Sequence, residues 1–431
     1  MMQSFLQKIS AAIKDPALRK RIGFTIGALI LFRLLAAIPV PGVNPATLAS
    51  LLNSSQFFGF LNIFSGGGLS NLSIVMLGVG PFITASIIVQ VLTMVLPKWK
   101  ALMHEEGEAG RMKLSQYSRI LGAPLAILQG IGYLILFQSQ GVLPHLGTFA
   151  FSTNVLVVAS GSILLMWLGE LVSEFGIGNG VSLIIFAGIV SRLPISFIQN
   201  LQKLMASDMA NLPFYLGVLV VAILATAGVI YVTEAERSVP VTYAKQVRGN
   251  KVYGGASTYI PLRLNQSGVI PIIFALSILL FPQIIFNALA KWAAHPALAS
   301  WSQSVALLLT PPSLVYGCLY FIMVVAFTYF YTAVTFDPQM ISENLQRSGA
   351  FIPGVRPGEH TRDYLGNIVT RITLVGAIFL GVVAILPLLI QLFSPDSTQS
   401  FAVGGTALLI VVSVVLDLLK KIDAQIAMRE Y

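Results

Sequence analysis

The lysine and arginine residues of this chain gather in alternate loops between long apolar runs, and this pattern constrains the fold more than any other feature. The sequence holds 26 of them. Twenty-two lie before the first run, after the last, or in the loops that follow the second, sixth and eighth. The other loops hold only Arg192, Lys203 and Lys291, and Arg33 lies inside the first run. Cytoplasmic loops of membrane proteins collect cations in this way. The chain is therefore predicted to cross a membrane many times.

The bulk composition agrees with this prediction. Hydrophobic residues make up 56 % of the chain and charged residues 10 %, whereas an ordinary soluble domain carries about 25 % charged residues. A helix needs about 20 apolar residues to cross the bilayer core. An even number of such runs places both termini in the cytoplasm, and the polar, basic N-terminal residues do not resemble a cleavable signal peptide. Ten runs are long enough, near residues 23–40, 74–96, 120–138, 153–172, 177–198, 214–233, 266–289, 314–336, 371–393 and 402–419.

The sequence lacks the motifs of the common enzyme classes. It contains no Gly-Lys pair, hence no Walker A loop, and neither an H-E-x-x-H nor a Gly-x-Ser-x-Gly motif. Charged groups are nearly absent from the predicted spans, although ion-coupled carriers keep such groups where they work. We therefore expect a passive conduit or scaffold that is not an enzyme and uses no cofactor or metal. The alternative is a secondary transporter that binds a small solute.

One apolar segment between the first two runs is too short to cross the bilayer. It extends from Phe57 to Phe64 and is followed by Gly66, Gly67 and Gly68, which permit a sharp bend. A half-helix that folds back into the protein fits this pattern, because irregular backbone at membrane depth must be covered by protein. A helix lying on the membrane surface fits equally well.

Four predicted spans begin with glycine or proline and continue with β-branched aliphatic residues. These side chains are stiff at χ1, and a ring of them can gate a pore by excluding water. For any single residue, contact with lipid or with neighbouring helices is the simpler interpretation. The residues are Val79 and Ile83 in the second span, Val181 and Ile185 in the fifth, Ile273 in the seventh and Ile410 in the tenth.

Two of the basic loops are long and shaped by glycine and proline. Residues 237–264 read as two strand-like stretches around the turn Arg248-Gly249-Asn250. The other loop is predicted to begin a helix at Asp337 and Pro338 and to end it at Gly349, ahead of Arg356. Such loops present cations away from the membrane, so we expect them to dock an acidic or phosphate-bearing partner.

With these features the chain resembles the SecY family, the channel-forming subunits of the bacterial Sec protein translocase. The similarity covers nearly the whole sequence and rests on many sequence motifs, which occur in the same order as in the family. They include IPVPGV (38–43), NIFSGG (62–67), GPFITASIIVQ (80–90), EGEAGRMKLSQYSR (106–119), GIGNGVSLIIFAGIV (176–190), the stretch 243–271, GAFIPGVRPGEHT (349–361) and FAVGGTALLIVV (401–412).

The resemblance implies an all-α membrane protein with ten transmembrane helices in two inverted pseudo-symmetric halves, like a clamshell around a central pore. Residues 1–205 would form the N-terminal half and residues 206–431 the C-terminal half. The six aliphatic residues above would form the pore ring. Thr84 and Phe281 would face each other across a lateral gate. Residues 57–71 would form a plug, including Phe60, Leu61, Asn62, Ile63, Phe64, Ser65, Gly66 and Gly67.

The resemblance also implies function, location and partners. Such a channel passes unfolded secretory chains across the bacterial cytoplasmic membrane and releases membrane segments sideways into the lipid. Loops 237–264 and 337–368, with Arg248 and Arg356, would dock the SecA motor ATPase or the ribosome, including its RNA. Further expected partners are the SecE and SecG subunits, signal peptides, unfolded precursor chains and membrane lipid.

Overall fold

The computed structural model describes residues 15–41, 65–104, 107–139, 141–144, 146–191, 212–244, 246–248, 251–253, 257–266, 270–292, 295–310, 313–392 and 404–427, with the single residues 48, 62, 194, 198, 202 and 268. Within this part the chain is mostly helical and forms two compact units, residues 1–217 with 394–431 and residues 218–393. Its helices long and apolar enough to cross a membrane are Met112–Gln138, Thr148–Phe175, Leu212–Glu234, Leu314–Arg347 and Glu359–Ile390.

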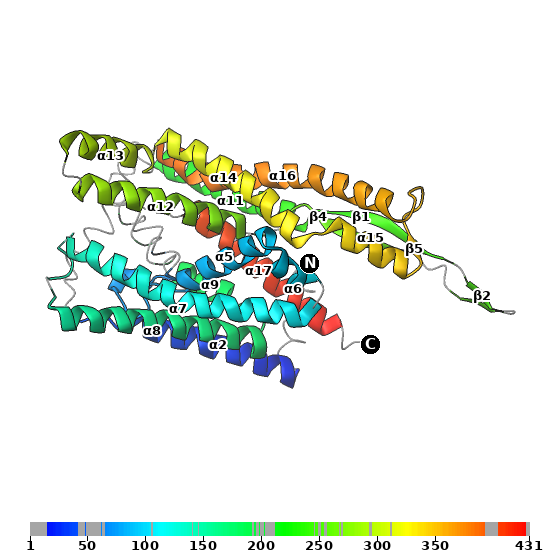
Figure 1. Ribbon diagram of the computed structural model, residues 1–431, viewed down its shortest axis with the longest axis horizontal. Helices are drawn as coiled ribbons and strands as arrows, with labels where there is room; N and C mark the ends of the chain where they lie inside the picture. The colour runs from blue at the N-terminus through cyan, green and yellow to red at the C-terminus, as the bar shows by residue number, and fades with distance from the viewer. Residues whose placement is uncertain are drawn as a thin grey trace. The chain divides into compact units, whose positions relative to one another are not determined.

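In the first unit, helices adjacent in the sequence lie against one another. α5 contacts α7, α7 contacts α8, and α8 contacts α9. Figure 1 shows α7 and α8 side by side. α2 contacts both α8 and α9, and α6 links α5 to α7. The elements are α2 (Pro16–Ala37), η1 (Gly68–Asn71), α5 (Gly80–Val95), α6 (Pro97–His104), α7 (Gly107–Ser139), α8 (Thr148–Phe175), α9 (Gly180–Val190) and α17 (Gly404–Ala427).

The last helix, α17, belongs to the first unit although it is far away in sequence. It lies against α9, and its Leu418 and Ile422 pack on the buried residues Leu18 and Ile177. Contacts therefore group the tenth predicted span with the first five. The predicted halves, residues 1–205 and 206–431, are defined by an inverted repeat, whereas the two units are defined by contacts. The contacts therefore do not test the predicted halves, which stay a prediction.

The second unit consists of helices and a small sheet. α12 contacts α13 and α14, and α14 runs along α16 (Figure 1). Phe274 of α12 meets Phe327 and Tyr331 of α14 edge-on, with ring centroids 6.0 and 6.2 Å apart. The helices are most of α11 (Leu212–Glu234), α12 (Ile270–Trp292), α13 (Pro296–Leu308), α14 (Leu314–Thr335), α15 (Pro338–Arg347) and α16 (Glu359–Leu392).

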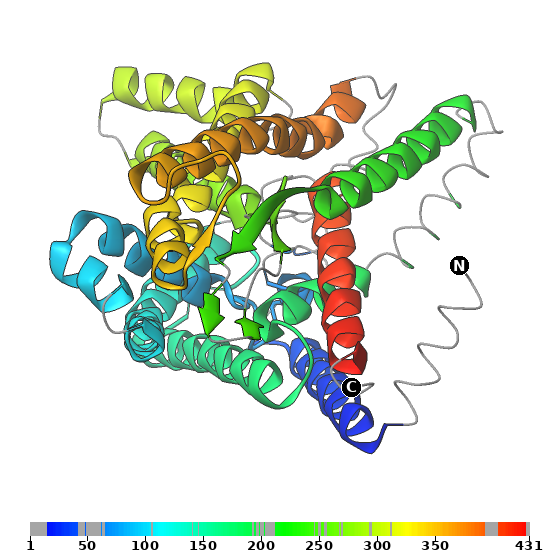
Figure 2. The same ribbon diagram turned by 90° about the vertical axis from the view of Figure 1, so that its right-hand side faces the viewer.

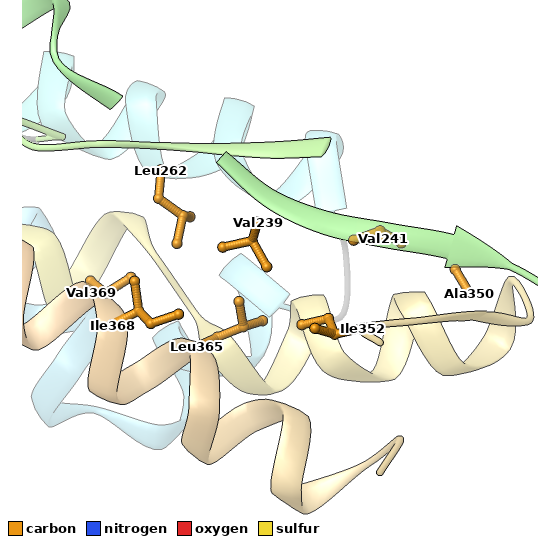
Figure 3. Packing of buried hydrophobic residues seen from close by; sticks show 8 residues of the cluster. All are labelled: Val239, Val241, Leu262, Ala350, Ile352, Leu365, Ile368 and Val369. Carbon is orange, nitrogen blue, oxygen red and sulfur yellow. The ribbon is translucent and has the colours of Figure 1, made fainter. Parts of the chain in front are cut away.

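The sheet of this unit covers the start of α16. Its antiparallel strands have the order β4 (Ser257–Arg263), β1 (Glu236–Tyr243) and β5 (Ala350–Phe351). Val239 and Val241 alternate with exposed residues on β1, and with Leu262 of β4 they are buried in one cluster with Leu365 and Ile368 of α16 (Figure 3). The sheet and α16 lie side by side in both ribbon views (Figures 1 and 2).

A separate hairpin joins β1 to β4. β2 (Gln246–Arg248) pairs with β3 (Lys251–Tyr253), and Arg248 lies opposite Lys251. The hairpin lies beyond α15 and β5 (Figure 1). The prediction of strands in loop 237–264 is thus confirmed. The structure has four strands there, β1 to β4, where two strand-like stretches were predicted.

Each of the ten predicted runs overlaps a described helix, but the ends differ. Residues 74–79 are turns, so α5 begins later than predicted. α7 and α16 begin more than ten residues before their apolar runs, because polar turns continue the helix where its hydrophobicity ends. The helix predicted at Asp337 is confirmed: this carboxylate accepts from the amides of Gln339 and Met340. Helices α6 and α13 and strand β5 were not predicted.

Candidate functional site

Residues 65–72, here called the Gly turn, are held together by hydrogen bonds centred on Asn62. The Asn62 side-chain oxygen accepts from the amide of Ser70 (3.1 Å) and from its hydroxyl (3.2 Å). The Ser65 hydroxyl donates to the Asn62 carbonyl (3.0 Å) and accepts from the Leu69 amide (3.0 Å). The Gly67 amide donates to the same Asn62 carbonyl (2.8 Å). Asn62 and Ser65 are buried, so these bonds satisfy oxygen atoms that would be costly to bury unpaired.

The Gly turn reverses direction at two glycines. Gly66 and Gly67 have φ values of 62° and 86°, a region that side chains disfavour. The predicted bend at these glycines is therefore confirmed. The half-helix predicted before them lies outside the described residues apart from Asn62. Four of the predicted plug residues are outside as well, namely Phe60, Leu61, Ile63 and Phe64.

Two helices of the first unit lie directly against Gly66. A Cβ atom added to Gly188 of α9 would overlap the Gly66 Cα, so the backbone of α9 touches the backbone of the turn. On α2, the ring of the fully buried Phe32 lies 2.7 Å from the place of a Cβ on Gly66. Only glycine at both positions allows this approach.

Arg33, the one charge deep in a predicted span, also reaches the Gly turn. Its Nη1 donates to the Gly66 carbonyl oxygen (3.3 Å), and its guanidinium carbon lies 5.9 Å from the Phe32 ring centroid. Ionisable side chains inside membrane spans are costly and usually functional. The sequence marked Arg33 as exceptional, but it could not identify an acceptor 33 residues further along the chain.

Five of the six predicted ring residues lie in the first unit. Val79 is fully buried at the start of α5, and its carbonyl accepts from the Ile83 amide (3.0 Å). Ile185 of α9 and Ile410 of α17 are buried, whereas Ile83 and Val181 are partly buried. α9 contacts α17. These helices thus share one unit, while the ring itself stays a prediction.

Serine residues of α8 fix the irregular starts of α5 and α9. The Ser162 hydroxyl donates to the Gly78 carbonyl (2.8 Å) just before α5. The Ser173 hydroxyl accepts from the Gly180 amide (2.8 Å) at the first residue of α9. At this end the Asn179 side chain also accepts from a first-turn amide. Gly78 and Gly178, next to these starts, have positive φ values, and side chains of α8 bond the backbone there.

The remaining predicted pore and gate residues are distributed over both units. Ile273 is a buried residue of α12 in the second unit, which also contains Phe281. Thr84 is in α5 of the first unit, and its hydroxyl donates to the Gly80 carbonyl (3.0 Å). The gate between Thr84 and Phe281 stays a prediction.

The two predicted docking arginines lie in different parts of the second unit. Arg248 belongs to β2 of the hairpin. Arg356 is exposed in the loop between β5 and α16, next to the sheet. Nearby cations are engaged locally: Arg347 pairs with Glu343 (3.6 Å) and Arg362 with Asp363 (2.9 Å).

Comparison with known proteins gives one consistent result. The SecY family model matches residues 73–419. The protein translocase subunit SecY of Mycobacterium tuberculosis is 40 % identical over 447 aligned residues, covering 100 % of this chain and 99 % of that protein. SecY of Escherichia coli K12 is 41 % identical over 421 residues, covering 96 % and 93 %.

Solved structures show the same fold at lower identity. One described as a protein conducting channel has a TM-score of 0.64 and 19 % identity over 96 % of this chain and 94 % of the other. A second, whose description says that the plug domain of SecY stabilises the closed channel, has a TM-score of 0.65 at 18 % identity, covering 96 % and 93 %. Sec61 from the canine ribosome-channel complex has a TM-score of 0.62 at 18 %, covering 96 % and 94 %.

The contact between Gly188 and Gly66 leads to a first prediction. In Gly188→Ala the new methyl group would overlap the Gly66 backbone, so we expect the Gly turn to move away from α9. Leu69, which is 1 % exposed, would then become accessible. With Cys318 changed to serine and Leu69 to cysteine, maleimide should label position 69 about ten times faster in the alanine variant, which corresponds to about 1.4 kcal/mol.

The matched control is Gly132→Ala on α7, where an added Cβ meets nothing within 4 Å. This change should leave the labelling rate at that of the parent, because alanine only improves helix propensity there. Equal labelling rates in the Gly188 and Gly132 variants would show that the contact does not hold the turn.

Proposed function

This chain belongs to the SecY family, and from that premise we propose that it acts in a bacterial cytoplasmic membrane with both termini in the cytoplasm. It is a protein-conducting channel subunit of the protein translocase, a multi-pass membrane protein and not an enzyme. The observation that carries this conclusion is the match at about 40 % identity along the whole chain. Family membership favours the channel over the alternative of a small-solute transporter, because the matching relatives are translocase subunits and protein-conducting channels.

The partners in this proposal are SecE and SecG subunits, the SecA motor and the ribosome. The cationic loops of the second unit support the last two, since they present Arg248 and Arg356 on a hairpin and on an exposed loop. Solved relatives are described in complexes with the canine ribosome and with the yeast 80S ribosome. Signal peptides and unfolded precursor chains are the proposed cargo.

The proposed closed pore uses both the aliphatic ring and the plug. Val79, Ile185 and Ile410 are buried, as a water-excluding constriction requires. The Gly turn supports assignment of residues 57–71 as the plug, because it is internally bonded and rests on α2 and α9. In the proposed lateral gate, Thr84 on α5 and Phe281 on α12 separate when a signal peptide leaves sideways.

The pore ring leads to a second prediction. Replacing Ile83, Ile185 and Ile273 together by glycine should make resting membranes leak ions, because three stiff side chains would be lost from the constriction. We expect the single-channel conductance of the resting protein in planar bilayers to rise from near zero to a clearly measurable level.

The control for the ring carries three glycines at exposed positions on membrane helices, namely Ile120, Ile163 and Ile285. It loses the same aliphatic volume and pays a similar cost of about 1 kcal/mol per glycine in helix propensity. If the ring variant conducted no more than this control, the three isoleucines would be ordinary packing residues.

The docking loop leads to a third prediction. Arg356→Glu should reduce ATP-driven import of a secretory precursor into vesicles by more than about tenfold, because it removes a charge-assisted contact and adds repulsion toward an acidic partner. Membrane insertion, expression and thermal stability should stay near the parent, since Arg356 is exposed. Arg248→Glu should act in the same direction but more weakly, because Lys245 and Lys251 keep that loop basic.

Arg347→Glu is the matched control for this charge reversal. Arg347 lies on α15, and its side chain is 77 % exposed. It undergoes the same change of two charge units in the same part of the chain. Normal import by the Arg356 variant, or equal losses in both variants, would contradict a specific docking role.

A further inference from the structure

The loop that carries Arg356 is anchored to the sheet on its N-terminal side. Ile352 is 2 % exposed and belongs to the apolar cluster between the sheet and α16 (Figure 3). The Val355 amide donates to the Ile352 carbonyl (3.0 Å), and the Val355 side chain packs against the same cluster. The chain is thus fixed up to the residue before the arginine.

Two buried hydroxyl groups hold the loop on its C-terminal side. Thr361, which is 1 % exposed, donates from its Oγ1 to the carbonyl of Arg356 itself (2.9 Å). Ser342 of α15, 3 % exposed, donates from its Oγ to the Gly358 carbonyl (2.6 Å). The Gly358 carbonyl also accepts from the amides of Thr361 (3.0 Å) and Arg362 (3.1 Å) in the first turn of α16.

These hydroxyls differ from most of the described ones on α14 and α16. Most described serine and threonine hydroxyls of α14 and α16 bond a carbonyl one turn back in their own helix, as Thr370 does with Gly366 (2.8 Å). Thr361 instead reaches back across the loop, and Ser342 connects two elements that are 16 residues apart. Neither bond lies within one helix, and each ties a helix residue to the backbone of the loop.

We infer that Thr361 and Ser342 are positioning residues, whose hydroxyl groups clamp the backbone of Arg356 and Gly358 and so present the Arg356 side chain to its partner. This inference rests on the proposed docking function of Arg356 and extends it to the residues that hold the arginine. The partner is an acidic surface of the soluble motor, because a guanidinium on a fixed backbone binds a carboxylate with defined geometry.

The clamp should act on partner affinity more than on the fold. A loop that is already ordered loses little conformational freedom when a partner binds it. Without the hydroxyl of Thr361, the loop would have to be ordered during binding. The membrane helices and the apolar cluster do not depend on this bond, so the maximal rate at saturating motor should change little.

The test measures ATP-driven import into vesicles at increasing concentrations of the motor ATPase. For Thr361→Val, which keeps the shape and removes the hydroxyl, we expect the motor concentration for half-maximal import to rise about three- to tenfold. Ser342→Ala should raise it in the same direction. Thr361→Ser, which restores the hydroxyl, should return it to the parental value. Hydrogen exchange of the amides of Gly354, Val355, Arg356 and Gly358 should accelerate in the valine variant and recover in the serine variant.

Thr370→Val is the matched control, since it removes a threonine hydroxyl from the same helix but from a bond within that helix. Parental half-maximal concentration and hydrogen exchange in Thr361→Val would overturn the inference. So would an equal defect in Thr361→Ser, or a loss of maximal rate and thermal stability together. If Arg356→Glu itself imported normally, the proposed docking function would fail; if only Thr361→Val did so, the clamp alone would fail.

Discussion

Inside a bilayer there is no water to pair with a backbone N–H or C=O group, and each unpaired group costs several kcal/mol. Regular helices meet this requirement by themselves, but the Gly turn is irregular and lies against two apolar helices of the first unit. Three of its backbone groups are paired by side chains nearby: Asn62 accepts from the Ser70 amide, Ser65 accepts from the Leu69 amide, and Arg33 donates to the Gly66 carbonyl. The Asn62 side-chain nitrogen, in contrast, is buried without a hydrogen-bond partner among the described residues. The contact of Gly188 with Gly66 then brings α9 close enough to cover the turn. The irregular starts of α5 and α9 follow the same rule, since Ser162 and Ser173 of α8 each pair with a backbone group there.

In the second unit the constraint is different. The sheet and the loop of Arg356 lie beyond the apolar runs and need packing of their own to be ordered. α16 has 34 residues and is therefore about 50 Å long, whereas the hydrocarbon core is about 30 Å thick. Its first turns continue the helix past the apolar run and provide Leu365 and Ile368 as the floor of the sheet. The cluster in Figure 3 thus connects a membrane helix to β1 and β4, the strands on either side of the hairpin of Arg248, and to the loop of Arg356. The loop of Arg356 leads directly into α16, so a partner bound at this loop is connected to a membrane helix by one continuous helix.

The sequence predicted those features whose signal is local. Apolar runs located the helices, Asp337 and Pro338 located the start of α15, and the glycines located the bend at Gly66. Helix ends were less predictable, because hydrophobicity stops at the membrane surface while backbone hydrogen bonding continues, as α7 and α16 show. Contacts between distant residues were not predictable: nothing in the sequence connects Gly188 to Gly66, Arg33 to its acceptor or Thr361 to the Arg356 carbonyl. The six ring residues were candidates from the pattern at their span starts, but only the family resemblance placed them in one ring and paired Thr84 with Phe281, because periodicity cannot identify which helices are neighbours.

The hydrogen bonds in and beside the Gly turn fall into three groups that bear on how a closed channel could open. Those from Asn62 and Ser65 lie within the segment and would move with it. At its C-terminal end the segment is tied to the end of α2, where the Val40 amide donates to the Leu72 carbonyl (2.8 Å) and the Ile74 amide to the Ile38 carbonyl (3.0 Å). At the same end the Asn71 side-chain amide donates to the Ala36 carbonyl (3.5 Å). Between these groups, among the residues that the structure describes, Arg33 donates to the Gly66 carbonyl, and at 3.3 Å this bond is long for a charge-assisted hydrogen bond. Such a bond contributes about 1.5–3 kcal/mol at most. On the proposed assignment of residues 57–71 as the plug, displacement with the internal bonds and the tether intact gives up this bond together with the contacts of Gly66 with Phe32 and Gly188 and the burial of Leu69. The binding of a partner or a signal peptide therefore has to offset lost apolar packing as well as one hydrogen bond.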